Sequence, residues 1–400
     1  MADLKMVEDL TNAFGPSGFE EEVVQAVKKH SGSLYLEHDA MHNVYAYMDE
    51  AAKKRCMPEA DRKRPVLMLD AHSDEVGFMV QNIEENGLLD IICLGGIHNT
   101  NIPAHSVIVK NRAGKKIRGI TTSKPVHFLT AAERADNSLN IEDIRIDVGA
   151  SSRREVMEDY GVAVGDPVMP DVKFEYDEDH GICYGKAFDN RLGCVSILST
   201  MKALQAESEQ LAVEVVGGFA AQEEVGTRGA QVTSQQLLPD LAIVFEGSPA
   251  DDFYFRPGIA QCSLKAGTQI RHMDASYVSN PEFIRLAQEI GDKCGIKYQD
   301  AVRRGGSTNA GKISLTGKAV PVLVLGIPSR YVHTHYNFCA MEDIDATVKM
   351  AVEVIRSLDK ERIDIVMRRG IIGTGQFNSQ ERAGYSDSRC REFCGGCFED

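Results

Sequence analysis

The sequence contains no tryptophan, no excess of basic residues and no apolar run that approaches the about 20 residues of a membrane-spanning helix. Its formal net charge is −15 at pH 7. Because nucleic-acid backbones bind basic surfaces, this charge argues against a nucleic-acid partner. Sugar rings stack on aromatic side chains, so the missing tryptophan argues against a cleft for polysaccharides. We therefore expect a protein that binds neither membranes nor nucleic acids.

Residues 1–8 show no basic region followed by an apolar run, so we do not expect them to be a signal peptide. Ten cysteines are scattered along the chain and are expected to be reduced, which predicts a cytoplasmic protein. Near the C-terminus, Cys390, Cys394 and Cys397 form a cluster that could bind zinc or an iron–sulfur cluster, or form a redox pair. The cluster lacks a fourth ligand, so a disordered, reduced tail is the favoured interpretation.

The 400 residues, 43% of them hydrophobic, are enough for two or three packed units. Four apolar runs each end in polar residues, which is typical of buried parallel strands. Helical periodicity lies between them, so the sequence predicts an α/β fold with a mixed, largely parallel sheet flanked by helices. The runs are Val66–Leu69 before Asp70, Ala71 and His72; Val213–Ala221 before Gln222, Glu223 and Glu224; Leu241–Phe245 before Glu246; and Val322–Ile327 before the segment that contains His333.

Residues 78–175 differ from this pattern, because short strand-like segments alternate there with turns. We predict that they form a smaller β-rich domain inserted into the larger one. The larger domain would then be discontinuous, over residues 1–77 and 176–360, and residues 361–400 would be a flexible tail. Near the N-terminus, Ser17-Gly18-Phe19-Glu20 resembles a capping box that starts a helix ending at about Lys29.

Seven acidic and histidine residues stand close to the predicted strand tips or at a helix start. The carboxyl ends of parallel strands meet at one edge of an open α/β sheet, so residues far apart in sequence can converge there. Asp189 begins a predicted helix, where the helix dipole favours a carboxylate. The seven residues are His72, Asp74, Asp189, Glu223, Glu224, Glu246 and His333.

The chemistry of this set suits two divalent cations. Two histidines and three carboxylates fit Zn²⁺, Co²⁺ or Mn²⁺ and lack the thiolates of a structural zinc site. One carboxylate can bridge two metals about 3.5–4 Å apart. Asp74 follows His72 by two residues and can accept the second imidazole proton, which fixes the ring. Of the neighbours Glu223 and Glu224, one would bind metal while the other handles a proton.

Each residue also has an ordinary structural interpretation. A histidine at a strand end is more often a hydrogen-bonded structural residue than a ligand. Adjacent glutamates usually belong to a solvated helix start, and Asp189 would be a helix N-cap. The coincidence of five candidate ligands on suitable elements favours the metal site over these alternatives.

Long motifs in the chain resemble those of the M42 family of metallo-aminopeptidases, over residues 1 to about 360. They occur in the family's order, and they include segments of the predicted β-rich domain. The matching segments are Ala71–Phe78 (first metal motif), Ala187–Gly193 (bridging aspartate), Gln222–Ala230 (base and ligand), Ile327–Thr334 (last histidine) and, in the β-rich part, Asp147–Arg153 and Gly165–Val168.

The resemblance implies a zinc-peptidase-like catalytic domain that removes N-terminal residues from peptide substrates with two divalent metal ions, zinc or cobalt first and manganese second. It also implies that the β-rich insertion serves assembly into a homo-oligomer, such as a dodecamer built from dimers. Glu223 would be the general base, and Asp74 would orient His72. The implied ligands are His72, Asp189 and Glu246 for one metal and Asp189, Glu224 and His333 for the other, with Asp189 bridging.

Two positions depart from the family pattern. The family often has aspartate where Glu246 stands, and the longer glutamate would change the metal spacing or affinity. It also often has aspartate in place of Asn309, which would bear on recognition of the substrate's amine.

Two other functions remain as alternatives. A related two-metal deacylase or carboxypeptidase acting on N-acyl amino acids would share the sheet and the ligands. Such enzymes carry a differently inserted domain, and the segment Asp147–Arg153 argues against them. A non-catalytic shell protein of the same fold would have no chemical need for all five ligands together with Glu223. We therefore predict an aminopeptidase.

Overall fold

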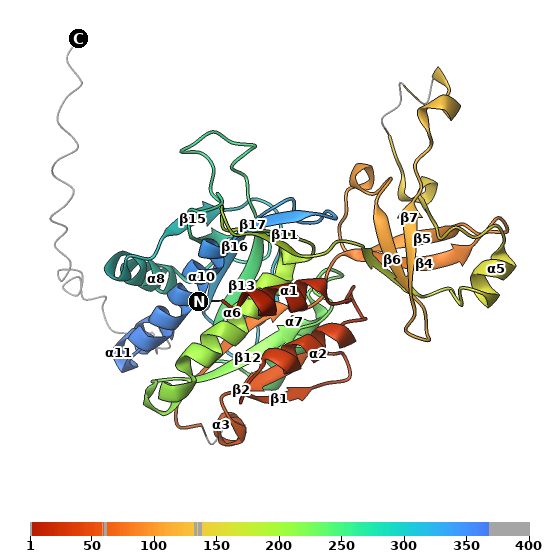
Figure 1. The fold of residues 1–400 in the computed structure, drawn as a ribbon. Helices are drawn as coiled ribbons and strands as arrows, with labels where there is room; N and C mark the ends of the chain where they lie inside the picture. The colour runs from red at the N-terminus through yellow and green to blue at the C-terminus, as the bar shows by residue number, and fades with distance from the viewer. Residues whose placement is uncertain (1, 58, 60–61, 132–133, 135–137, 368–400) are drawn as a thin grey trace, which may run out of the picture. The chain divides into compact units, whose positions relative to one another are not determined.

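The computed structural model describes residues 2–57, 59, 62–131, 134 and 138–367 (Figure 1). The predicted tail cluster of Cys390, Cys394 and Cys397 lies outside these residues, so its role stays a prediction. Among the helices of the described part, none is long and apolar enough to cross a membrane.

A large mixed sheet has four parallel strands at its centre, in the order β12, β3, β13 and β16. Every residue of β12 and β3 is buried, which explains why their sequences read as continuous apolar runs. The predicted strands are therefore confirmed. Their bounds are Glu214–Ala220 (β12), Val66–His72 (β3), Leu241–Pro249 (β13) and Val322–Arg330 (β16).

Antiparallel strands extend this core on both sides and make the sheet mixed. On one side β2 pairs with β12 and β1 with β2, and on the other β17 pairs with β16 and leads to β11 and β10. The short strands β14 and β15 branch from β16. The bounds are Tyr35–His38 (β1), Val44–Tyr47 (β2), Glu175–Asp177 (β10), Ile182–Gly185 (β11), Thr268–Met273 (β14), Tyr298–Val302 (β15) and Asn337–Ala340 (β17).

Helices flank the sheet. The long helix α6 (Phe188–Leu204) packs on β3 and β13, and α1 and α10 pack against it in turn (Figure 1). Helix α7 packs on β12 and β3 and contacts α9. The other bounds are Leu4–Asn12 (α1), Glu21–His30 (α2), Glu50–Cys56 (α3), Arg228–Leu237 (α7), Pro281–Cys294 (α8), Ala310–Ile313 (α9), Met341–Ser357 (α10) and Lys360–Met367 (α11).

Six strands between β3 and β10 close into a small barrel, in the order β4-β5-β8-β7-β6-β9. The barrel has its own apolar core, around Phe78, Val107 and Ile146. A short helix, α5 (Arg153–Glu158), precedes β9. The predicted fold class, an α/β fold with a smaller β-rich insertion, is thus confirmed, while the exact domain boundaries stay a prediction. The strands are Gly77–Ile83 (β4), Leu89–Leu94 (β5), Ser106–Lys110 (β6), Lys116–Thr121 (β7), Arg145–Asp147 (β8) and Pro167–Pro170 (β9).

Two local predictions were wrong. Residues 361–367 belong to helix α11 instead of a flexible tail, because Ile363 and Val366 are buried on the side that contacts α8. The capping box at Ser17 and Glu20 does not form either. Helix α2 begins at Glu21, and the Glu20 side chain makes no capping bond. Both side chains instead bind distant residues at the edge of the sheet.

Candidate metal centre

The predicted site residues meet at the carboxyl edge of the central strands. His72 is the last residue of β3, and β12 and β13 lie on either side of that strand. Glu223 and Glu224 occupy the turn after β12, and Glu246 lies on β13. Asp189 lies in the first turn of α6, where the backbone is not helical, and His333 follows β16. The convergence predicted from the strand tips is therefore observed.

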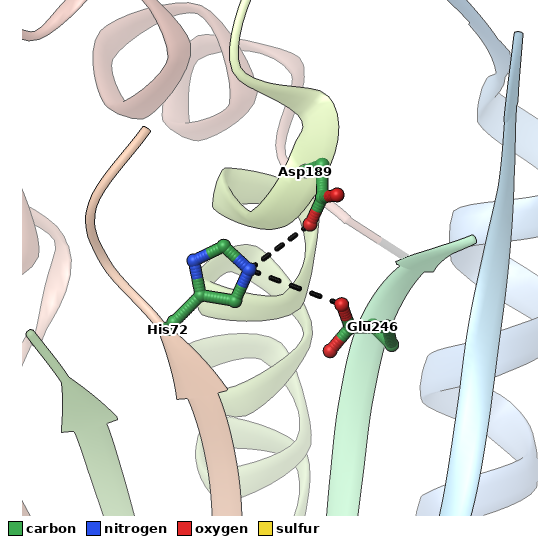
Figure 2. Close-up of side chains that lie close together, drawn as sticks. All are labelled: His72, Asp189 and Glu246. Carbon is green, nitrogen blue, oxygen red and sulfur yellow. Dashed lines mark hydrogen bonds and ion pairs between the residues drawn. The ribbon is translucent and has the colours of Figure 1, made fainter. Parts of the chain in front are cut away.

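The first group of side chains is His72, Asp189 and Glu246 (Figure 2). The Nε2 atom of His72 lies 3.0 Å from Asp189 Oδ1 and 3.9 Å from Glu246 Oε1. One potential ligand atom from each residue lies within 4.8 Å of the others. Figure 2 shows the histidine ring edge and both carboxylates pointing toward a common point. One cation would fit this geometry.

The second group is Asp189, Glu224 and His333. His333 Nε2 lies 3.3 Å from Asp189 Oδ2 and 3.6 Å from Glu224 Oε2. Asp189 therefore turns one oxygen to His72 and the other to His333. In a third combination, His72, Glu223 and Glu224 also bring one potential ligand atom each within 4.8 Å of the others.

Neighbouring groups set the orientation of both imidazole rings. Nδ1 of His333 lies 2.7 Å from the carbonyl oxygen of Gly96, which leaves Nε2 directed at the carboxylates. Gly96 belongs to the segment that follows barrel strand β5. Nδ1 of His72 lies 3.3 Å from Asp74 Oδ1, a close electrostatic contact that falls short of a well-aligned hydrogen bond. Such contacts favour the tautomers that metal-binding histidines adopt.

Asp74 does more than the sequence predicted. Its carboxylate accepts hydrogen bonds from the backbone N–H groups of Glu223 at 2.9 Å and Glu224 at 3.1 Å. Ser17 Oγ donates a third bond at 2.6 Å. The same carboxylate therefore touches the His72 ring and holds the turn that carries both glutamates. Ser17 was not among the predicted site residues, because the local pattern around it resembled a helix cap.

Charge is crowded in this cluster. Burial, and then neighbouring carboxylates, raise the pKa of Glu223 to about 7, that of Glu224 to about 8 and that of Glu246 well above its usual value. Burial would raise the pKa of Asp189 too, but hydrogen bonds to His333 and His72 hold it below its usual range. Burial lowers the pKa of His333, yet Asp189 and Glu224 outweigh it and raise the pKa to about 10.

The residues present fit divalent cations. Without a cation, the cluster relieves repulsion among its carboxylates by retaining protons, as the raised pKa values indicate. Within the part of the chain that the structure describes, the buried Oε1 atom of Glu224 has no hydrogen-bond partner. Mixed imidazole and carboxylate donors suit Zn²⁺, Co²⁺ or Mn²⁺. A cation would satisfy these groups better than protons do.

A pocket of about 630 Å³ opens over the cluster. The residues that line it include the carboxylates of the cluster and three arginines, Arg271, Arg303 and Arg304. Arg271 is buried, with Nη2 bonded to Ser248 Oγ at 2.7 Å, whereas Arg304 is exposed. These arginines were not among the predicted site residues, although Arg303 and Arg304 directly precede the Gly-Gly segment that also lines the pocket.

Asn309 does not line this pocket, which argues against the expected link to the substrate's amine. It is buried, and its Nδ2 atom donates to Asp70 Oδ1 at 2.7 Å. An aspartate at this position would face another buried carboxylate, whereas the asparagine amide can donate a hydrogen bond to it.

A cluster of histidines and carboxylates at the carboxyl edge of a largely parallel sheet, lining an open pocket, is typical of the metal-dependent hydrolases. The protein falls into this class. Residues 55–350 match the family model described as M42 glutamyl aminopeptidase, and the chain belongs to this family of metal-dependent peptidases.

Relatives of known sequence and structure agree with this assignment. The chain is 30% identical over 359 residues to the glutamyl aminopeptidase of Lactococcus lactis, covering 89% of this chain and 97% of that protein. The lysyl aminopeptidase of Pyrococcus furiosus is 25% identical over 368 residues, covering 90% of this chain and 98% of that one. The TET aminopeptidase from Thaumarchaeota archaeon SCGC AB-539-E09 has a TM-score of 0.84 at 30% identity, over 91% of this chain and 99% of that chain. The protein is therefore a peptidase, and its relatives support an aminopeptidase activity.

Proposed function

We propose that the protein is a two-metal aminopeptidase that removes N-terminal residues from peptides, with Glu223 as general base. The main support is the position of Asp189, whose two oxygens face two different histidines at 3.0 and 3.3 Å. A bridging carboxylate of this kind is a feature of two-metal hydrolases. A single-metal site would need only one of these faces.

The two ligand sets follow from this bridge. His72 and Glu246 would complete the site on one side of Asp189, and Glu224 and His333 would complete it on the other. Zinc or cobalt fits the donors first and manganese second. When bound, the two cations would lower the pKa of a water and polarise the scissile carbonyl.

Glu223 would do the proton transfer. It lines the pocket beside the ligand set, and its Oε2 lies 3.9 Å from His72 Nε2. From there it would take a proton from the attacking water and pass it to the leaving amine. Glu224 is the better ligand of the two, because it is closer to His333 at 3.6 Å. Asp74 would keep the His72 ring in place and hold the turn that carries Glu223.

The arginines that line the pocket support a preference for one kind of N-terminal residue. Guanidinium groups bind carboxylates and repel cations. Arg303 is already paired with Asp251 at 2.8 Å, so the exposed Arg304 would favour an acidic side chain at the N-terminus of the peptide. The activity named for the L. lactis relative agrees with this preference, and the lysyl activity named for the P. furiosus relative does not.

A panel of aminoacyl chromogenic substrates, assayed with metal-free protein and then with each cation, tests the activity. We expect no hydrolysis without metal, recovery with zinc or cobalt, and the highest kcat/KM for glutamyl and aspartyl substrates. Arg304→Ala should reduce kcat/KM roughly tenfold for these substrates, since a hydrogen bond to a charged group contributes about 1.5–3 kcal/mol. The same variant should leave the kcat/KM for a leucyl substrate unchanged. Arg154→Ala, at an exposed position of α5, is the control and should change neither value. Hydrolysis of N-acyl amino acids but not of free N-termini would favour the deacylase alternative.

Assembly and location complete the proposal. A Pyrococcus horikoshii TET1 peptidase with the same fold, at 24% identity, is described as assembling into a tetrahedron or a large octahedral shell. By analogy, the barrel would mediate a homo-oligomer of this chain in the cytoplasm, such as a dodecamer. Light scattering should then give a mass several times 43.9 kDa. A fully active monomer would contradict the assembly.

A further inference from the structure

The turn after strand β12 has an unusual set of hydrogen bonds. Four consecutive backbone N–H groups, from Ala221 to Glu224, donate to side chains and not to other backbone groups. Asn43 Oδ1 accepts from Ala221 at 2.8 Å, and Glu20 Oε1 accepts from Gln222 at 3.1 Å. The carboxylate of Asp74 accepts the last two. Side chains from three separate segments therefore define the path of the turn that carries the general base.

Glu20 stands out among these acceptors. It is fully buried, and its Oε1 atom also accepts a hydrogen bond from Gly18 N at 2.8 Å. It is the N-cap residue of α2, yet its side chain does not cap that helix. Its Oε2 atom is buried and has no hydrogen-bond partner among the described residues. Burying a carboxylate in this way costs free energy of folding. Because the side chain does not cap α2, the helix gains nothing that would offset this cost.

The backbone at Gln222 explains what the contact achieves. Gln222 has a φ of 54°, in the left-handed region that a non-glycine residue rarely adopts. Strained backbone of this kind persists when surrounding groups hold it. The bond from Gln222 N–H to Glu20 is such a restraint, and it acts on the residue directly before Glu223. Loss of the restraint would let the turn relax and move the Glu223 carboxylate relative to the pocket.

We propose that Glu20 is a positioning residue, which fixes the catalytic turn through Gln222 and so aims Glu223 at the reacting water. This inference rests on the proposed role of Glu223. Glu20 touches neither substrate nor metal in this scheme. Its effect should therefore fall on the catalytic step and not on metal binding.

Three variants test the proposal in the full-length, metal-loaded enzyme. Glu20→Ala removes the acceptor, Glu20→Gln keeps an acceptor oxygen without the charge, and Glu21→Ala alters the exposed neighbour as a control. We expect Glu20→Ala to lower kcat roughly 10–100-fold, the range typical of lost orienting partners, with little change in KM or metal content. Glu20→Gln should retain most of the kcat, and Glu21→Ala all of it. Equal losses in the alanine and glutamine variants, or loss of metal in step with activity, would overturn the proposal.

A double-mutant cycle separates this inference from the proposed function. If Glu20 acts through Glu223, adding Glu20→Ala to Glu223→Gln should reduce kcat little further than Glu223→Gln does alone. Fully additive losses would overturn the positioning role while leaving Glu223 as the base. A Glu223→Gln variant with normal kcat would instead refute the proposed function itself. If Glu20→Ala does not fold, as judged by thermal melting, the same cycle with Glu20→Asp, which shortens the reach to Gln222, decides the question.

Discussion

The central sheet and the barrel expose their side chains in different ways. Every residue of strand β3 is buried, whereas barrel strand β7 alternates between exposed and buried residues. A parallel strand covered on both faces meets solvent only at its ends, so its polar residues gather there. A barrel strand has an outer face along its whole length. Among the described residues, all candidate ligands accordingly lie on or next to strands of the central sheet or in helix α6. The segment after barrel strand β5 contributes only the carbonyl group of Gly96, which contacts His333.

This contrast predicts the largest effect for a residue that serves both halves of the metal site. Asp189→Ala should remove the bridge, reduce the content of both metals and bring activity to background. His333→Ala should reduce the content of one metal and leave the other. Elemental analysis and the aminoacyl assay measure both effects, with Asp177→Ala on exposed strand β10 as the control. Normal metal content and rate in Asp189→Ala would show that the sheet edge is not the metal site.

The next effect should separate the two neighbouring glutamates of the sheet edge. Glu223→Gln keeps the size of the side chain but cannot accept the proton, so kcat should fall by roughly 10²–10⁴-fold with both metals bound. Glu224→Gln should instead weaken metal binding, because it replaces an anionic ligand by a neutral one. If the two variants show the opposite pattern, with metal lost from Glu223→Gln, the roles of the two residues must be exchanged.

A smaller effect tests whether the barrel segment matters for chemistry. A Cβ atom at Gly95 would lie 2.8 Å from Val76 Cγ1 and 3.0 Å from Glu224 Cβ, at a φ of +87°. Gly95→Ala should therefore shift Glu224 or the carbonyl that holds His333, and lower kcat/KM roughly 10–100-fold. Gly114→Ala in the β6–β7 hairpin has a similar φ of +79° and open space around it, so it isolates the backbone strain. Equal activity in the two variants would mean that the barrel segment has no catalytic influence.

The smallest effect concerns stability and pH in metal-free protein. Glu223, Glu224 and His333 all have pKa values raised by the fold, to about 7, 8 and 10. At these three groups the folded state therefore binds more protons than the unfolded chain, so their contribution to stability is lost as pH rises through these values. The Tm of chelator-treated protein should drop from pH 6 to pH 9. Added zinc should raise the Tm and reduce this slope, because cations replace the protons. Differential scanning fluorimetry measures the Tm at each pH. A Tm of the metal-free protein that rises from pH 6 to pH 9 would contradict the raised pKa values of these groups.

Segments with strong local patterns were predicted well. The runs before His72 and Glu246 form strands that are buried on both faces of the covered sheet, as short continuous apolar runs bounded by polar residues indicate. The pattern around Ser17 and Glu20 was misread because its partners are remote. Ser17 bonds Asp74, 57 positions away, and Glu20 bonds Gln222, 202 positions away. A local cap signature carries no information about such contacts.

The order of apolar runs and motifs in the chain was thus sufficient for the fold class, the peptidase family and the set of candidate ligands, because strand burial and strand tips leave a direct trace in the amino-acid order. Three features depended on the folded chain: the two faces of Asp189, the hold of Asp74 and Glu20 on the catalytic turn, and the Gly96 carbonyl beside His333. Each is a distance of about 3 Å between groups far apart in sequence, and only the packing of the surrounding elements sets such a distance.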